Sequence, residues 1–151
     1  MYRRIAQTWR KLWSDRPPEI RSRAITWRRG ATITRLERPS RLDRARSLGY
    51  KSKQGFVILR VKVAKGGMRR KRPRSGRRPK HLGVVKIKAA VGMQEVAEKR
   101  AAKRFPNLYP LNSYYIFDDG RSFWYEVILV DPHHPAIVND KDLRWLVNKT
   151  K

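Results

Sequence analysis

LNSYYIFDDGRSFWYEVILV, residues 111–130, is the segment most informative about the fold. It contains two runs rich in aromatic and β-branched residues, 111–117 and 122–130, joined by the turn sequence DDGR at 118–121. Such runs favour strands, and Asp-Gly between them is a strong hairpin signal. The second run is apolar on both faces apart from Glu126, which is typical of a strand inside a sheet. We therefore predict an antiparallel hairpin whose second strand is an interior strand.

Two further long elements follow from hydrophobic periodicity. Residues 56–64 are predicted to form a strand, because the valines and leucine of this run, Val57, Leu59, Val61 and Val63, alternate onto one face. Residues 93–104 are predicted to form a helix, because apolar and small residues recur there at helical spacing. The sequence Phe-Pro-Asn at 105–107 ends this helix.

The N-terminal part is predicted to contain two helices. In residues 2–13, one apolar stripe is formed by Ile5, Trp9, Leu12 and Trp13. A second helix begins near Pro17-Pro18-Glu19 and ends at Gly30, because Pro is tolerated in a first turn. We expect the tryptophans of both helices to pack against the body of the protein, and the alternative is that they stack on bases.

Shorter elements complete the prediction. Residues 32–36 favour a strand, residues 84–88 suit another short strand, and residues 140–147 suit a last helix. Ser40 and Asp43 have the spacing of a helix-capping box with Asp in place of Glu. One or two helical turns are therefore expected after Ser40, closed by Gly49.

Charge is the dominant feature of the composition. The 151 residues include 38 Lys and Arg against 12 Asp and Glu, a net charge of +26. Residues 1–94 hold 29 basic and 4 acidic side chains, whereas residues 95–151 hold 9 and 8. The positive charges of such a protein repel one another, and binding to a polyanion neutralises them. RNA or DNA is the usual polyanion. A merely solvated basic surface is the weaker interpretation, since soluble domains usually stay within about 8 charges of neutrality.

The most basic segment is residues 65–81. Between Arg69 and Lys80, 8 of 12 residues are Lys or Arg, with Pro73, Gly76 and Pro79 among them. This composition cannot form a packed core, so the segment is expected to become ordered on RNA. A nuclear localisation signal has the same composition and remains an alternative that RNA binding does not exclude.

Several classes of protein are disfavoured. The chain has no Cys, which excludes disulfides and thiolate zinc sites, and no apolar run approaches the length of a membrane span. The first 14 residues are basic and amphipathic, as mitochondrial transit peptides are. Transit peptides are rich in Ser, however, and this stretch has a single Ser, Ser14, and a single Thr, Thr8.

Candidate catalytic residues are few. A metal site for phosphodiester hydrolysis would need the side chains Asp118, Asp119, Asp131, His133 and His134 to converge. Adjacent histidines in a strand point to opposite faces, and the Asp118-Asp119 pair is better explained as a turn former. There is no phosphate-binding Gly-rich loop and no Ser/His/Asp pattern. We predict no catalytic residue, no metal and no cofactor.

A series of collinear segments carries a family resemblance. They are RPSRLDRARSLGYKSKQGF (38–56), RVKV (60–63), GRRPK (76–80), VAEKRA (96–101), FPNL (105–108), LNSY (111–114) and EVILVDPHHPAI (126–137). Together they resemble large-subunit ribosomal protein fifteen of the archaeal and eukaryotic type, which is distinct from the bacterial protein that shares the number. Members of that family usually continue past the region of Trp145 into a second basic tail, so contacts of that tail are not transferred to this chain.

The resemblance implies an α+β fold, with a small antiparallel sheet flanked by helices and long basic extensions and loops that bind RNA. It implies a structural constituent of the large ribosomal subunit in the cytoplasm and no enzymatic activity. The implied partners are large-subunit ribosomal RNA and neighbouring ribosomal proteins, with no membrane and no small-molecule substrate. We treat residues 1–151 as a single domain of three parts: a basic helical part (1–50), a basic strand and loop (51–94) and a near-neutral body (95–151).

The predicted mechanism is neutralisation of phosphates by the cations between residues 35 and 88, in a complex that is therefore sensitive to salt. Because the deep groove of A-form RNA is closed to side chains, specificity would come from RNA shape, 2′-hydroxyls and unpaired bases. Tyr50 and Gln54 lie between two glycines that permit close backbone approach, and are the candidates for stacking and hydrogen bonding. The alternative for Tyr50 is packing under its own turn.

The predicted RNA-binding residues are Arg35, Arg38, Arg41, Arg44, Arg46, Tyr50, Lys51, Lys53, Gln54, Arg60, Lys62, Lys65, Arg69, Arg70, Lys71, Arg72, Arg74, Arg77, Arg78, Lys80 and His81. The strand at 56–64 turns from apolar to basic on its second face at Arg60 and Lys62, so we expect it to lead out of the core toward RNA. Two other functions remain possible: a free-standing architectural protein that binds duplex DNA comparably to RNA, and a metal-dependent nuclease.

Overall fold

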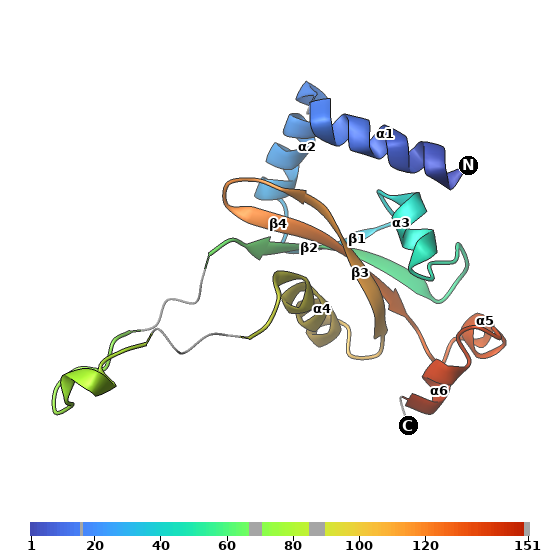
Figure 1. Ribbon diagram of the computed structural model, residues 1–151. Coiled ribbons are helices and arrows are strands. Elements are labelled where there is room, and N and C mark those ends of the chain that lie inside the picture. The colour runs from blue at the N-terminus through green and yellow to red at the C-terminus, as the bar shows by residue number, and fades with distance from the viewer. Residues whose placement is uncertain (16, 67–70, 85–89, 150–151) are drawn as a thin grey trace.

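A computed structural model describes residues 1–15, 17–66, 71–84 and 90–149, with no account of the side chains of residues 148 and 149. It shows helices and a four-stranded sheet (Figure 1). In chain order the elements are α1 (Tyr2–Asp15), α2 (Pro18–Arg29), β1 (Ile33–Leu36), α3 (Leu42–Ser47), β2 (Phe56–Ala64), η1 (Pro79–His81, a 3₁₀ turn), α4 (Met93–Arg104), β3 (Tyr109–Asp118), β4 (Ser122–Val130), α5 (Pro135–Val138) and α6 (Trp145–Lys149). The fold is therefore of the α+β class, as expected.

The sheet is antiparallel throughout, in the order β1-β2-β4-β3. Strand β4 pairs with β2 along its whole length, from Ser122 opposite Ala64 to Val130 opposite Phe56. Its other edge pairs with β3 through the hairpin turn, where Asp119 Oδ1 accepts hydrogen bonds from the backbone N–H groups of Arg121 and Ser122. The interior position of this strand and the hairpin are both confirmed.

Helix α4 covers one face of the sheet (Figure 1). Its Ala97 and Ala101 are fully buried against Leu59, Val61 and Val127 of the central strands. Small residues on the helix let it approach the sheet closely, which is why the face of β2 that carries the alternating valines is closed to solvent. The sequence-based boundaries of this helix are those observed.

Helices α1, α2 and α3 lie over the opposite face of the sheet (Figure 1). Trp27 of α2 lies 6.2 Å from the ring of Phe117 and 6.3 Å from the ring of Trp124, while Trp13 of α1 lies edge-on to Phe117 at 5.3 Å. Aromatic rings bury large apolar areas, and such clusters hold two otherwise marginal helices to the sheet. The expectation that Trp13 and Trp27 pack against the protein is confirmed.

A third small core forms where the chain ends. Ile137 of α5, Leu143 and Leu146 are buried against Val130 at the end of β4. The predicted helix over 140–147 is wrong in its boundaries, because residues 141–144 form turns and the helix begins at Trp145. The short helix α5 was not predicted, since its four residues are too few to show a period.

The segment between β1 and α3 corrects another prediction. Helix α3 forms as expected and Gly49 follows it with φ +97°, a value that favours glycine. The capping box is wrong, however: the N-cap residue is Arg41, and the Ser40 side chain bonds Glu126 instead. In a cap the Ser40 hydroxyl would accept from a backbone N–H of the helix, whereas here it donates to the Glu126 carboxylate. The predicted strand at 84–88 falls on residues 85–89, outside the described part of the chain.

Candidate nucleic-acid interface

The predicted RNA-binding residues fall into two groups in the structure. One group is exposed and consists of Arg35, Arg38, Arg44, Arg46, Gln54, Lys71, Arg72, Arg74, Arg77, Arg78, Lys80 and His81. The other group has contacts inside the protein and consists of Arg41, Tyr50, Lys51, Lys53, Arg60, Lys62 and Lys65. Arg69 and Arg70 lie outside the described residues. Whether each of these residues contacts RNA stays a prediction.

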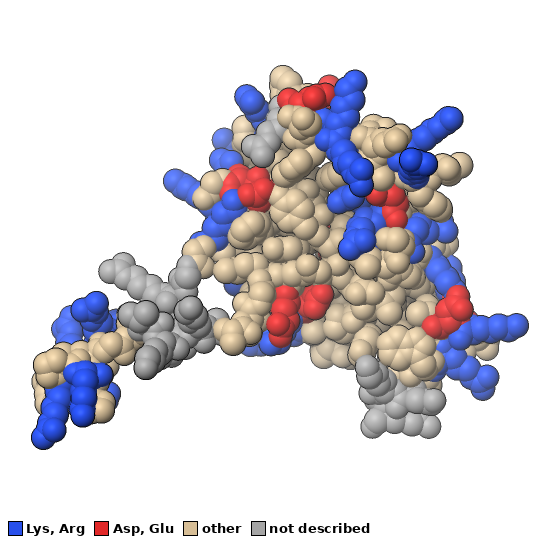
Figure 2. Space-filling view, viewed as in Figure 1, with Lys and Arg blue, Asp and Glu red and all other residues tan. Residues whose placement is uncertain are grey.

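The exposed cations of residues 71–81 lie on a segment that projects from the body (Figures 1 and 2). Between Lys71 and Arg78 the chain forms no helix or strand. The one regular turn in the described residues 71–84 is η1, at Pro79–His81. Pro and Gly prevent a longer helix here, and the like charges repel one another. The result is a cationic arm with its side chains in solvent.

A second exposed group lies on the body around α3. Arg35 is in strand β1, Arg38 is in the loop that follows, and Arg44 and Arg46 are on α3 itself, and all four are exposed. Helix α3 is anchored by Ala45, which is fully buried in the core beneath it. Its short length and single buried face leave the arginines directed away from the core.

Arg60 and Lys62 contradict the expectation that β2 leads out of the core. Both side chains face helix α2: the Arg60 guanidinium lies 4.5 Å from the ring centre of Trp27, and Lys62 Nζ donates to the carbonyl oxygens of Arg28 and Gly30. Burial lowers the pKa of Arg60, and the charge of Glu126 opposes that shift. Cations at the end of α2 also suit the negative end of the helix dipole. These two residues therefore hold α2 to the sheet.

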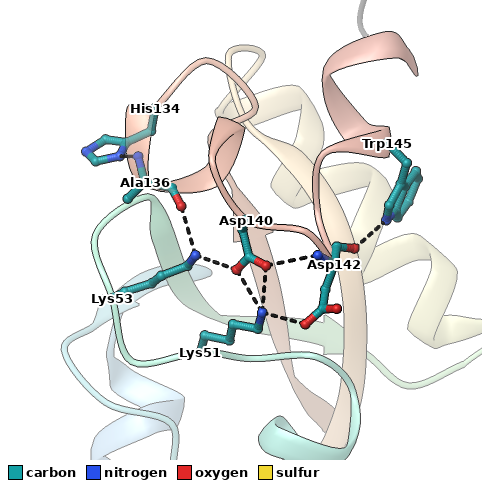
Figure 3. A network of polar contacts seen from close by, with 7 residues as sticks. All are labelled: Lys51, Lys53, His134, Ala136, Asp140, Asp142 and Trp145. Atoms are coloured by element: carbon teal, nitrogen blue, oxygen red, sulfur yellow. Dashed lines mark hydrogen bonds and ion pairs between the residues drawn. The ribbon is translucent and has the colours of Figure 1, made fainter.

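Lys51 and Lys53 meet two aspartates from the other end of the chain (Figure 3). Lys51 Nζ lies 2.7 Å from both Asp140 Oδ2 and Asp142 Oδ2, and Lys53 also bonds Asp140 and donates to the carbonyl oxygen of Ala136 at 2.8 Å. Hydrogen bonds from Lys51 and Lys53 hold the pKa of Asp140 below its usual range, and the same contacts raise the pKa of Lys51. The network fastens the loop after α3 to the segment between α5 and α6.

Arg41 and Lys65 also have partners within the protein. Arg41 lies 5.2 Å from the ring centre of Trp9 and 3.4 Å from Asp43. Lys65 pairs with Asp118 and lies 4.6 Å from the ring centre of Phe123. Both are partly exposed, so their internal contacts and an RNA contact are compatible.

Tyr50 is 8% exposed, and its ring lies edge-on to Phe56 at 5.6 Å. A base cannot stack on a ring whose faces are covered by the core, so the structure favours the alternative, packing under the turn. Gln54 is exposed and precedes Gly55, whose φ of +88° confirms the need for glycine in this loop. Gln54 therefore remains a candidate for hydrogen bonding to RNA.

Glu126 positions the loop that carries Arg38. It is fully buried in β4, and it accepts hydrogen bonds from the Ser40 N–H at 3.0 Å, the Ser40 hydroxyl at 2.5 Å and the Tyr114 hydroxyl. Burial raises the pKa of Glu126, although these hydrogen bonds oppose the rise. Sequence reasoning noted this residue as an exception in an apolar strand but could not identify its partner, which is 86 residues away.

The outer faces of α1 and α2 carry a third basic surface that the sequence-based list omitted. Its exposed residues are Arg3, Arg4, Arg10 and Lys11 on α1 and Arg21, Arg23 and Arg29 on α2. The apolar stripe of each helix packs inward, so its basic residues face out (Figure 2). The amphipathic pattern of α1 was visible in the sequence and would have identified the residues on that helix.

The residues considered for catalysis have other contacts. His134 Nδ1 accepts a hydrogen bond from Ala136 N at the start of α5, and Asp131 Oδ1 accepts one from His133 N. The two histidines lie in a turn and not in a strand. Within the described ranges, no three His, Asp or Glu side chains are grouped so that they could hold a metal ion. None of the helices found there has the length and apolarity to cross a bilayer.

The chain is similar in sequence to known proteins. A family model described as Ribosomal L15 matches residues 1–151. The large ribosomal subunit protein eL15 of Metallosphaera sedula is 51% identical over 148 residues, which cover 97% of this chain and 68% of that protein. The chain therefore belongs to the ribosomal L15 family, and it is a structural component of the large ribosomal subunit rather than an enzyme.

Proposed function

We propose that this protein stabilises the packing of large-subunit ribosomal RNA through three exposed basic surfaces. The surfaces are the arm (71–81), the group around α3 (Arg35, Arg38, Arg44, Arg46) and the outer faces of α1 and α2. The observation that carries the proposal is the division of the cations. Those with acidic or aromatic partners fasten the fold, whereas more than a dozen others extend into solvent.

The physical reason for such a division is the electrostatic repulsion between phosphates. RNA helices that approach each other repel through their backbones, and each guanidinium placed between them releases condensed counterions. Arginine adds planar, paired hydrogen bonds to phosphate, which a lysine ammonium cannot make. The folded body fixes the positions of the α3 group and of the charges on α1 and α2, while the arm extends its charges away from the body.

The arm gives the most direct test. In the full chain, the four exposed residues Arg72, Arg74, Arg77 and Arg78 would be changed together to Glu. Binding to protein-free large-subunit ribosomal RNA is expected to weaken, and the slope of log affinity against log salt should fall by about 4, roughly one for each lost phosphate contact. Incorporation into the subunit, followed by sucrose-gradient sedimentation, should fail for the same variant.

The control for the arm variant replaces Lys51 and Lys53 with Met. Their charges are already engaged by Asp140 and Asp142, so the salt slope should change by less than about 1 per residue even if stability falls. Normal incorporation of the arm variant, with an unchanged salt slope, would refute the proposal for the arm. Equal affinity for duplex DNA would favour an architectural DNA-binding role instead.

A further inference from the structure

An open pocket lies at the point where the edge strand β1 separates from β2. Its volume is about 480 Å³, within the range of sites for small ligands. Strand β1 pairs with β2 only as far as Leu36 opposite Ile58, whereas β2 continues to Phe56. The start of β2 is therefore not covered by β1, and the pocket lies along this edge with Tyr50 as part of its lining.

The pocket has one charged group of each sign. Arg35 and Glu37 both line it, two residues apart at the end of β1, and both are exposed. Within the part of the chain that the structure describes, neither forms an ion pair. Leu36, the last residue of β1, packs into the core, whereas Arg35 before it and Glu37 after the strand both line the pocket.

Glu37 is unusual for its surroundings. It is one of only 4 acidic residues in the first 94, and its neighbours Arg35 and Arg38 belong to the exposed basic group around α3. A free carboxylate among phosphate-binding cations repels the phosphates, unless it accepts hydrogen bonds from something other than phosphate. On RNA, strong donors of that kind are the exocyclic amino groups of adenine, cytosine and guanine.

We propose that this pocket holds a single unpaired nucleotide of ribosomal RNA. The Glu37 carboxylate accepts from the exocyclic amino group of the base, and Arg35 binds the adjoining phosphate. Unpaired bases are the parts of RNA whose edges are open to side chains, and they are the usual targets of sequence-specific contacts. Uracil has no amino group, so the site takes adenine, cytosine or guanine. The inference rests on the RNA-binding function proposed above.

The two interpretations of Glu37 predict opposite changes in RNA affinity when the residue is replaced by Ala. If Glu37 merely stands near RNA, Glu37→Ala removes a repulsive charge and binding to protein-free large-subunit ribosomal RNA becomes tighter. If Glu37 accepts from a base, the same variant binds about tenfold more weakly, the cost of one lost specific contact. Glu37→Gln keeps one accepting oxygen and should lose less affinity. Chemical probing of base edges should show one protected nucleotide that becomes reactive with Glu37→Ala while other protections remain.

The matched control is Glu19→Ala on α2, which removes the same charge from an exposed position outside this pocket. It should bind RNA as tightly as the wild type or more tightly. Thermal unfolding of both variants should match the wild type, because neither side chain is buried. Wild-type protein that fails to bind the RNA would refute the general proposal. Wild-type binding with an equally tight Glu37→Ala variant and unchanged base protection would refute the pocket alone.

The other occupant of an uncovered strand edge would be an extended protein segment. A Phe56→p-benzoylphenylalanine variant, which keeps Glu37 and Arg35 and places the probe in the pocket lining, distinguishes the two after incorporation into whole subunits and irradiation. A crosslink to one site in the RNA supports the proposal. A crosslink to a neighbouring ribosomal protein refutes it.

Discussion

At the scale of the residue, Glu126 shows how a single polar group can specify a loop. An ionised carboxylate inside a sheet is costly, and the hydrogen bonds from Ser40 and Tyr114 offset that cost only in part. Burial raises the pKa of Glu126, and burial together with Glu126 itself raises the pKa of the Tyr114 hydroxyl, which therefore stays protonated and donates. The two hydrogen bonds from Ser40 to Glu126 hold the loop with Arg38 against the sheet.

The raised pKa gives a pH dependence of known sign. A carboxyl with a higher pKa in the folded state contributes most to stability at low pH, and stability falls as pH rises from about 4.3, its unfolded value, through the folded pKa. Glu126→Gln stays neutral, so the free energy of unfolding of the wild type minus that of the variant should decrease over this window. Urea unfolding at a series of pH values measures it.

Asp140 provides an internal check on that experiment. Lys51 and Lys53 lower the pKa of Asp140, so the stability that the ionised Asp140 contributes is lost as pH falls below the pKa of the unfolded state. This loss is the same in the wild type and in the Glu126→Gln variant. The contribution cancels in the difference. Glu126→Ala leaves three donors, the Ser40 N–H, the Ser40 hydroxyl and the buried Tyr114 hydroxyl, without their acceptor, and should cost about 3 kcal/mol or more. A difference curve that rises with pH would show that hydrogen bonding outweighs burial at Glu126.

At the scale of the element, the turn into β2 and helix α5 depend on each other. Gly55 has φ +88°, and a Cβ added there would lie 2.6 Å from Ile137 Cγ1 of α5. The Asp131 N–H also donates to the Gly55 carbonyl oxygen at 2.9 Å. The close approach of backbone to helix is possible only without a side chain. The ion pairs of Lys51 and Lys53 reinforce the same junction.

Gly55→Ala is therefore expected to destabilise the protein by about 2–4 kcal/mol, from backbone strain and from displacement of Ile137. Denaturant unfolding of the full chain gives the value. Gly83→Ala is the matched control, because a Cβ there meets nothing within 4 Å, and it should change stability by less than about 0.5 kcal/mol. A tolerated Gly55→Ala would mean that α5 moves away from β2 without loss.

At the scale of the whole molecule, the charge opposes the compact state of the free protein. The net charge of +26 on 151 residues means that cations repel one another wherever their separation is shorter than the screening length of the solution. Within the described residues the ion pairs are concentrated at a few junctions, and the exposed cations point outward (Figure 2). The isolated protein is folded against its own charge, and RNA relieves that charge.

Salt should therefore act in opposite directions on folding and on binding. The melting temperature of the free protein is expected to rise by several degrees, on the order of 5 °C, between about 10 and 300 mM salt, because screening weakens the repulsion. Over the same range, affinity for ribosomal RNA should fall steeply. Calorimetry and filter binding measure the two trends. A free protein that melts lower in added salt would show that its internal ion pairs contribute more than the repulsion costs.

Local patterns were sufficient for most of the fold. The hairpin at 111–130, the strand at 56–64 and the helix at 93–104 were all predicted, because each has a period that burial on one or both faces imposes on the sequence. The four-residue helix α5 and the exact start of α6 were not, because such short elements show no period. The cap predicted at Ser40 failed because the Ser40 hydroxyl donates to Glu126, a partner far along the chain, and the N-cap residue is Arg41.

The charge of this protein, the positions of its longer elements and its family all follow from the amino-acid sequence, because they depend on composition, near neighbours and collinear motifs. Which of its cations are free depends instead on contacts between distant parts of the chain. Lys53 and Asp140 are 87 residues apart, and Arg60 meets Trp27 across two elements. Such partners are chosen by the packing of helices on the sheet. No local pattern records them, so the composition could count the cations but could not separate those that hold the fold from those that face solvent.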